Sequence, residues 1–172
     1  ITVNIQDNNN CLNSTSLTYT GIPLPTVGVN GNTNICIGST TTLTASGANT
    51  YTWNGVVAAT TITNNPTSNV VYTVVGTGTN GCNGVSTQSV NVFSLPNLSV
   101  SATKTSICCD ETITISVVGA NSYTWNNAVN SNSFVFTTTV YSGTFNFTVT
   151  GIDIFGCKST STIQIKVNDC FK

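Results

Sequence analysis

Cysteine is the residue type through which this chain could do the most chemistry. Its seven cysteines are Cys11, Cys36, Cys82, Cys108, Cys109, Cys157 and Cys170. So many thiols in a chain of 172 residues are typical of an oxidising compartment, where cysteines pair as disulfides. The alternative is a set of buried, reduced thiols. We favour disulfides and expect an extracellular or cell-surface protein.

The missing side chains exclude several functions. Without histidine or arginine, the chain lacks an imidazole base, an ordinary zinc site and a bidentate phosphate clamp. A hydrolase would have to bring together two of only five acidic residues, and their spacing does not suggest it. A net charge of −1 gives no electrostatic footprint for nucleic acid, and no apolar run approaches the ~20 residues of a membrane span. We therefore expect no enzyme, metal, cofactor, nucleic-acid partner or membrane span.

Four of the cysteines lie in a repeated sequence. The heptapeptide Gly47–Trp53 returns almost unchanged as Gly119–Trp125. The matched pairs around it are Ile35-Cys36 with Ile107-Cys108, and Gly81-Cys82 with Gly156-Cys157. Repetition at this period indicates two copies of one small domain. The expected parts are an N-terminal extension over 1–23, a first domain over 24–94 and a second domain over 95–172.

Apolar residues alternate with polar ones in both copies, as in strands that bury one face. The strands expected in the first copy lie near 26–30, 41–46, 50–54, 58–63, 70–77 and 84–93. Those expected in the second lie near 98–103, 112–118, 122–126, 133–139, 144–151 and 159–167. Short strands at such spacing predict an all-β chain of two tandem antiparallel β-sandwiches. Trp53 and Trp125 should fill the two cores, and ligand stacking is the alternative role.

The first copy carries a recognisable set of motifs. They are Ile35-Cys36-Ile37-Gly38-Ser39, Tyr51-Thr52-Trp53, Val71-Tyr72-Thr73-Val74 and Asn80-Gly81-Cys82, with counterparts in the second copy. This pattern resembles the immunoglobulin-like and PKD-like repeats of Bacteroidota extracellular proteins, including surface adhesins and gliding-associated secreted proteins. The resemblance covers about residues 24–168 and implies immunoglobulin-like sandwiches, in a module type that mostly forms spacers and stalks.

The pairing of the repeated cysteines depends on strand direction. If the third strand leads directly into the strand of the other sheet, the pairs Cys36–Cys82 and Cys108–Cys157 each share one end of a sandwich. A full extra strand instead places the two cysteines of a copy at opposite ends, about 20 Å apart, beyond the ~7 Å limit between bridged Cα atoms. Cys36 would then face the next domain near Cys157, and Cys82 would face the preceding subunit near its Cys108 or Cys109. We expect the intradomain pairs and keep the interdomain scheme as the alternative.

Three cysteines are left over in either scheme. An odd count in a secreted chain suggests an intermolecular bridge or a free thiol. One hypothesis is a head-to-tail bridge between Cys11 of one subunit and Cys109 or Cys170 of the next. The other is one intrachain pair and one free thiol.

The first 23 residues belong to neither copy. Their start suggests a processed mature terminus. Ile1, Val3 and Ile5 alternate with polar residues like a strand, and Asp7 to Asn10 reads as a polar hinge. One hypothesis is that this N-terminal strand is donated to the open edge of a neighbouring subunit. The alternatives are an extra strand packed on the chain's own first sandwich and a disordered tail.

The surface is nearly uncharged, with only 5% charged residues. Soluble sandwiches usually protect their edge strands with lysine, proline or bulges, so bare edges favour pairing unless sugar or another chain covers them. The candidate N-glycosylation sites are Asn13, Asn97 and Asn146.

These features together predict a structural subunit of an extracellular filament or surface fibre, assembling head to tail into a homopolymer by strand donation, disulfides or both. Its partners would be further copies and attached or surface glycans. The alternative is a stalk or a glycan- or surface-binding module of a large adhesin. That alternative predicts an exposed aromatic face, for which the candidates are Tyr19, Phe93, Phe134, Tyr141 and Phe171.

Overall fold

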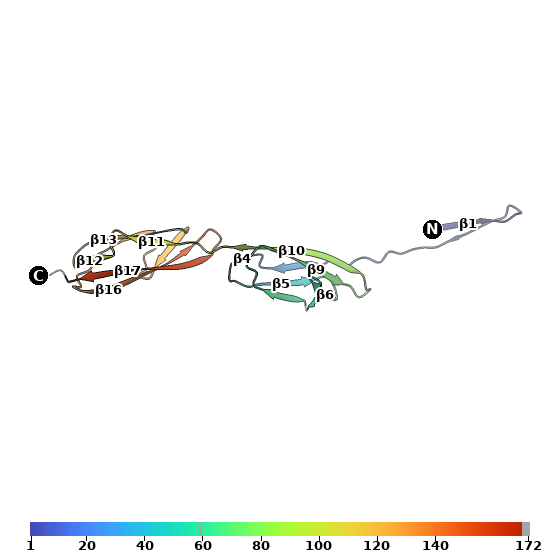
Figure 1. The fold of residues 1–172 in the computed structure, drawn as a ribbon. Helices are drawn as coiled ribbons and strands as arrows, with labels where there is room; N and C mark the ends of the chain where they lie inside the picture. Colours follow the sequence, from blue (N-terminus) through green and yellow to red (C-terminus); the bar gives the residue numbers. More distant parts are fainter. Residues whose placement is uncertain (59, 170–172) are drawn as a thin grey trace. The chain divides into compact units, whose positions relative to one another are not determined.

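The computed structural model describes residues 1–58 and 60–169, and every regular element in that part of the chain is a β-strand (Figure 1). The fold class expected from the alternating sequence, all-β with tandem immunoglobulin-like sandwiches, is confirmed. No helix long and apolar enough to cross a membrane is present among the described residues.

The first copy of the repeat forms two sheets. The larger has the strand order β4-β10-β9-β6-β7 and the smaller the order β3-β5-β8. The strands are β3 (Gly28–Gly31), β4 (Asn34–Cys36), β5 (Thr41–Ser46), β6 (Thr50–Trp53), β7 (Val56–Ala58), β8 (Thr61–Asn64), β9 (Val70–Thr77) and β10 (Asn83–Phe93). On β5 the side chains alternate between buried and exposed, as the sequence predicts for a strand with one buried face.

The second copy repeats this plan with one strand fewer. Its sheets have the orders β12-β17-β16-β14 and β11-β13-β15. The strands are β11 (Ser99–Ala102), β12 (Ser106–Cys108), β13 (Ile113–Val118), β14 (Ser122–Trp125), β15 (Ser133–Phe136), β16 (Gly143–Ile152) and β17 (Lys158–Asn168). The strand that the second copy lacks is a counterpart of β7.

Among the described residues, each strand of the two copies pairs within its own copy, whereas residue contacts group the chain differently. One compact unit comprises 1–30, 43–62 and 72–88, and the other comprises 31–42, 63–71 and the chain from Ser89 onward. The domain boundaries expected at 23/24 and 94/95 stay a prediction.

The repeated heptapeptide builds the turn between β13 and β14 in the second copy. Gly119 has a φ of +107°, and a Cβ atom there would lie 2.0 Å from the Asn97 carbonyl oxygen. The Tyr123 hydroxyl accepts a hydrogen bond from the Ala120 N–H and donates one to the Ala120 carbonyl, both at 2.8 Å. In the first copy, Tyr51 makes the same two bonds. The heptapeptide therefore recurs because glycine and tyrosine are both needed to close this turn.

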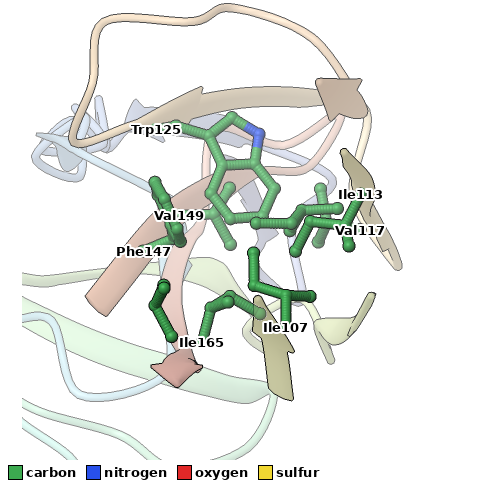
Figure 2. Close-up of a cluster of buried hydrophobic side chains, with 9 residues drawn as sticks. Ile107, Ile113, Val117, Trp125, Phe147, Val149 and Ile165 are labelled. Carbon is green, nitrogen blue, oxygen red and sulfur yellow. The ribbon is translucent and has the colours of Figure 1, made fainter. Parts of the chain in front are cut away.

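The second sandwich has a continuous apolar core (Figure 2). Trp125 is 2% exposed, meets Phe134 edge-on and donates its indole N–H to the Ser131 carbonyl at 3.0 Å. Trp53, its counterpart in the first copy, is 3% exposed. The prediction that both tryptophans are core residues is confirmed.

Two details differ from the strands expected. The single strand expected near 58–63 is two strands, because Asn54 and Gly55 adopt positive φ values and fold β7 back onto β6. The short strands β4 and β12 were not expected. Each pairs in parallel with the last strand of its copy, so that Cys36 lies opposite Phe93.

Replacing Trp125 by alanine should lower the free energy of unfolding by about 3–5 kcal/mol, because the core would keep part of the cavity. The matched control is Val135→Ala on β15, where the side chain is 65% exposed and the cost should be small. Urea unfolding followed by circular dichroism measures both. Equal costs would contradict the role of Trp125 as a core residue.

Candidate assembly surfaces

The turn that carries Cys82 has the same backbone as the turn that carries Cys157. In the β9–β10 turn, the Gly78 N–H donates to the Cys82 carbonyl at 2.9 Å, and in the β16–β17 turn the Asp153 N–H donates to the Cys157 carbonyl at 3.0 Å. The glycine before each cysteine has a positive φ, of 76° and 83°. The two cysteines therefore occupy equivalent positions in the two copies.

A second pair of equivalent turns follows β4 and β12. The Ser39 N–H donates to the Cys36 carbonyl at 2.9 Å, and the Glu111 N–H donates to the Cys108 carbonyl at 3.3 Å. The residue before each donor has a positive φ, 86° at Gly38 and 63° at Asp110. Cys108 is thus the counterpart of Cys36, and Cys109 takes the place of Ile37.

One disulfide joins the first copy to the second. Cys36 and Cys157 are bonded with a Cα–Cα distance of 5.5 Å, both within the compact unit that contains the second copy. The expected pairs Cys36–Cys82 and Cys108–Cys157 are therefore wrong. The alternative, in which Cys36 meets Cys157, is confirmed. Cys108 is also disulfide-bonded.

Strand direction explains this correction. In the second copy, β13 is antiparallel to β15 and β14 is antiparallel to β16, so the chain returns between β14 and β15 and β13 runs parallel to β16. Cys108 precedes β13 and Cys157 follows β16, so they belong to opposite ends of the sandwich. In the first copy, β7 makes the same return as a paired strand. A bridge across the length of a six-residue strand is out of reach.

Three cysteines among the described residues are free thiols. Cys11 is exposed, and Cys82 and Cys109 are half-buried. Sequence reasoning set Cys109 aside correctly but assigned Cys82 to a disulfide. Cys170 lies outside the described residues.

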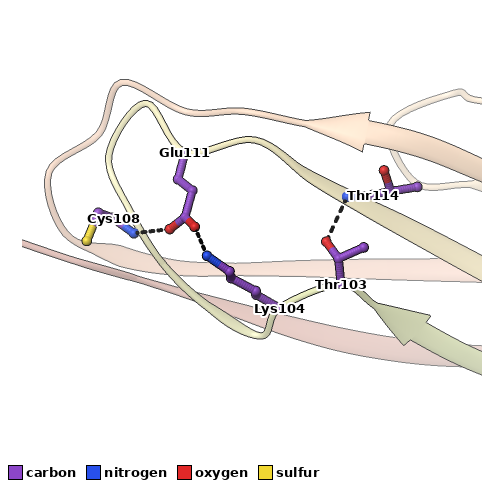
Figure 3. A network of polar contacts seen from close by, with 5 residues as sticks. All are labelled: Thr103, Lys104, Cys108, Glu111 and Thr114. Atoms are coloured by element: carbon purple, nitrogen blue, oxygen red, sulfur yellow. Dashed lines mark hydrogen bonds and ion pairs between the residues drawn. The ribbon is translucent and has the colours of Figure 1, made fainter.

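A small polar network holds the turn that contains Cys109 (Figure 3). The Glu111 carboxylate accepts a hydrogen bond from the Lys104 ammonium group and another, at 3.2 Å, from the Cys108 N–H. The Lys104 hydrogen bond is the main cause, and the Cys108 N–H the next, of a pKa for Glu111 below its ordinary value of 4.5. The carboxylate is therefore ionised at neutral pH and fixes the backbone on both sides of Cys109.

The N-terminal residues form a hairpin of their own. Strands β1 (Thr2–Gln6) and β2 (Leu12–Ser16) pair only with each other among the described residues, with Val3 opposite Thr15 and Ile5 opposite Asn13. The turn between them lies where a polar hinge was expected, and the Asp7 carboxylate accepts hydrogen bonds from the N–H groups of Asn9 and Cys11.

The hairpin presents an apolar face to solvent. Residues that pair across an antiparallel ladder share a face, so Ile1, Val3, Ile5 and Leu17 lie together. Their exposed fractions are 84%, 48%, 63% and 70%. The alternative of an extra strand packed on the chain's own first sandwich does not agree with this, because β1 and β2 form a separate two-stranded sheet and are exposed throughout.

Strand β14 is a partly open edge of the second sandwich. In the first copy, β7 covers the corresponding strand β6, whereas among the described strands β14 pairs with β16 alone. The Trp125 N–H donates to the Val129 carbonyl and the Trp125 carbonyl accepts from the Ala128 N–H, both at 2.9 Å, so the edge is occupied at Trp125. A polar groove of about 700 Å³ runs beside it, lined by residues 120–124 and 130–132. Only the part of β14 before Trp125 is therefore left for another strand to pair with.

The aromatic residues proposed for a flat binding face do not behave alike. Tyr19 and Tyr141 are 86% and 57% exposed, but Phe134 is half-buried and packs against the core residues Trp125 and Phe147. Phe93 stacks on Phe155 with ring centroids 4.0 Å apart. Phe171 lies outside the described residues.

The candidate glycosylation sites are all exposed. They are Asn13, Asn97 and Asn146. The Asn146 side-chain oxygen accepts a hydrogen bond from Gln164 at 3.1 Å.

No protein-family model and no curated protein matches the chain. Among solved structures, it is similar to murine CEACAM1b, with 10% identity over 83% of this chain and 100% of that one, at a TM-score of 0.41. It is also similar to three N-terminal domains of the bacteriophage RB49 outer capsid protein Hoc, with 16% identity over 84% of this chain and 59% of that one, at a TM-score of 0.41.

A further similar structure is a Ca²⁺-stabilised adhesin with which an Antarctic bacterium binds ice. Its identity is 16% over 97% of this chain and 56% of that one, and the TM-score is 0.45. TM-scores below 0.5 are too low for these similarities to assign a function to this chain.

The Glu111 network leads to a prediction about pH. Because the folded-state pKa is below 4.5, the contribution of the carboxylate to stability should be complete above pH 4.5 and be lost as the pH falls through the folded-state value. An NMR titration of the Glu111 side chain should give a midpoint below 4.5. Lys104→Met should raise that midpoint, and Lys166→Met should not. A midpoint unchanged by Lys104→Met would contradict the network.

Proposed function

We propose that this chain is a structural subunit of an extracellular filament or surface fibre, in which copies assemble head to tail through the N-terminal hairpin. The observation that supports this most directly is the apolar face of the hairpin. Ile1, Val3 and Ile5 lie on it, and their exposed fractions are 84%, 48% and 63%.

A two-stranded hairpin is marginally stable in water, and it gains stability when a hydrophobic face packs against another element. Among the described residues, neither β1 nor β2 pairs with any other strand of the chain. A second copy that covered Ile1, Val3 and Ile5 would remove this apolar surface from water. Exposed apolar patches of this kind mark association surfaces.

The receiving surface in this proposal is the open edge at β14. An extended segment can add to such an edge through main-chain hydrogen bonds, as in strand addition. In this proposal β1 would pair with the part of β14 before Trp125, because the N–H and carbonyl of Trp125 are already bonded to Val129 and Ala128. Since the first copy covers this edge with β7, only the second copy is left to accept a strand there.

Low charge and disulfides fit the same function. With 5% charged residues, the chain has little of the charge that natural edge strands use against pairing. The Cys36–Cys157 disulfide is typical of an extracellular or cell-surface location. In this proposal the chain works without catalysis or a cofactor, and glycans attached to exposed asparagines would be its non-protein partners.

The test compares the two faces of the hairpin in the full chain. Replacing Ile1, Val3 and Ile5 by serine should abolish filaments, because the apolar face is lost. The matched control replaces Thr2, Asn4 and Gln6 by serine, which changes the polar face of β1, and should leave filaments intact. Electron microscopy and sedimentation measure assembly, and the melting temperature of both variants should stay unchanged.

Removal of residues 1–10 should have the same effect as the apolar-face variant. Filaments that persist after this deletion would overturn assembly through the hairpin. Absence of filaments from the unmodified chain in every condition would instead favour a stalk or surface-binding module of a larger adhesin.

A further inference from the structure

We infer that Cys82 of one copy forms a disulfide with Cys109 of the neighbouring copy, so that the joint between copies repeats the joint within the chain. This inference rests on the proposed head-to-tail assembly and names the residues that would lock it.

The template is the bond between Cys36 and Cys157. It joins the turn after β4 of the first copy to the β16–β17 turn of the second copy. The equivalent turns that this bond leaves unused are the one after β12, with Cys108 and Cys109, and the β9–β10 turn, with Cys82. In a head-to-tail chain of copies, the second sandwich of one copy is followed by the first sandwich of the next. The turn after β12 of one copy would therefore face the β9–β10 turn of the next copy, just as the turn after β4 faces the β16–β17 turn within the chain.

Cys82 lies in a turn with the same backbone geometry as the turn of the bonded Cys157. Its turn has the backbone hydrogen bonds and the positive-φ glycine of the Cys157 turn. Cys157 is fully buried in its disulfide, whereas Cys82 is half-buried and carries a free thiol. The cysteine of this turn is therefore disulfide-bonded in the second copy, at Cys157, and free in the first copy, at Cys82.

The doubled cysteine supplies the other thiol. Cys108, the counterpart of Cys36, is already disulfide-bonded, while Cys109 is free. In the first copy this next position is Ile37, which is 41% exposed. The Glu111 carboxylate, held by Lys104 and the Cys108 N–H, fixes the turn around Cys109. One cysteine of the doublet is therefore used within the chain and the other is kept for a neighbour.

The bond requires an oxidant, and we assign this role to a small-molecule disulfide such as oxidised glutathione. The thiols of Cys82 and Cys109 lose two protons and two electrons as their sulfur–sulfur bond forms. The sulfur–sulfur bond of glutathione breaks and takes up both electrons and protons as two thiols. An oxidising extracellular compartment can supply this exchange.

The test uses the full chain oxidised with glutathione and separated by electrophoresis without reductant. The unmodified chain should give a ladder that collapses with reductant, and mass spectrometry should find a peptide that joins Cys82 to Cys109. Cys82→Ser and Cys109→Ser should each lose the ladder. An equimolar mixture of these two variants should give dimers only, because each molecule then offers one complementary thiol. Cys11→Ser is the matched control and should keep the ladder.

A ladder that persists in Cys82→Ser or Cys109→Ser, a ladder lost in Cys11→Ser, or an interchain peptide that joins other cysteines would overturn the inference. Electron microscopy in reductant separates this result from the proposed function. Filaments that form in reductant but never give the Cys82–Cys109 peptide after oxidation would refute the disulfide and leave the filament. Absence of filaments together with absence of a ladder would count against both.

Discussion

The direction of the strands is the constraint on which the rest of this structure depends. Because β13 and β16 run parallel, the cysteines that flank them belong to opposite ends of the sandwich. No side-chain rearrangement can bridge the length of a strand. A copy of the repeat therefore cannot join its own two repeated cysteines to each other. The Cys36–Cys157 disulfide instead joins the two copies of a single chain.

The two copies differ at the edge of one sheet and in the number of cysteines in one turn, and both differences concern groups that could pair with another copy. The first copy covers the edge of β6 with β7, and the second leaves the edge of β14 open before Trp125. The first copy has one cysteine after β4, whereas the second has a doublet after β12. The second copy thus has free backbone groups on β14 and a free thiol at Cys109, and the first copy has neither at the corresponding positions. A chain with complementary unused groups in its two copies is suited to adding further copies, and the apolar face of the N-terminal hairpin is a third group of this kind.

Much of the fold could be predicted from local sequence. Period-two alternation located most of the strands, and the heptapeptide located the turn that Gly119 and Tyr123 close. Trp53 and Trp125 were identified as core residues because a large aromatic side chain on the inward face of a sandwich strand fills the space between the two sheets. The short strands β4 and β12 could not be found this way, because three residues are too few to show alternation.

The sequence by itself determined the repeat, the all-β fold class, the two tryptophan cores and the number of thiols, since each of these depends on residue type and spacing along the chain. Only the tertiary structure decided which thiols meet, that β1 folds onto β2 instead of the first sandwich, and that Phe134 packs against the core. The physical reason is that these outcomes depend on the directions in which distant strands run. The sequence on either side of Cys82 is compatible with both directions, and the path of the chain between β6 and β9 chooses one of them.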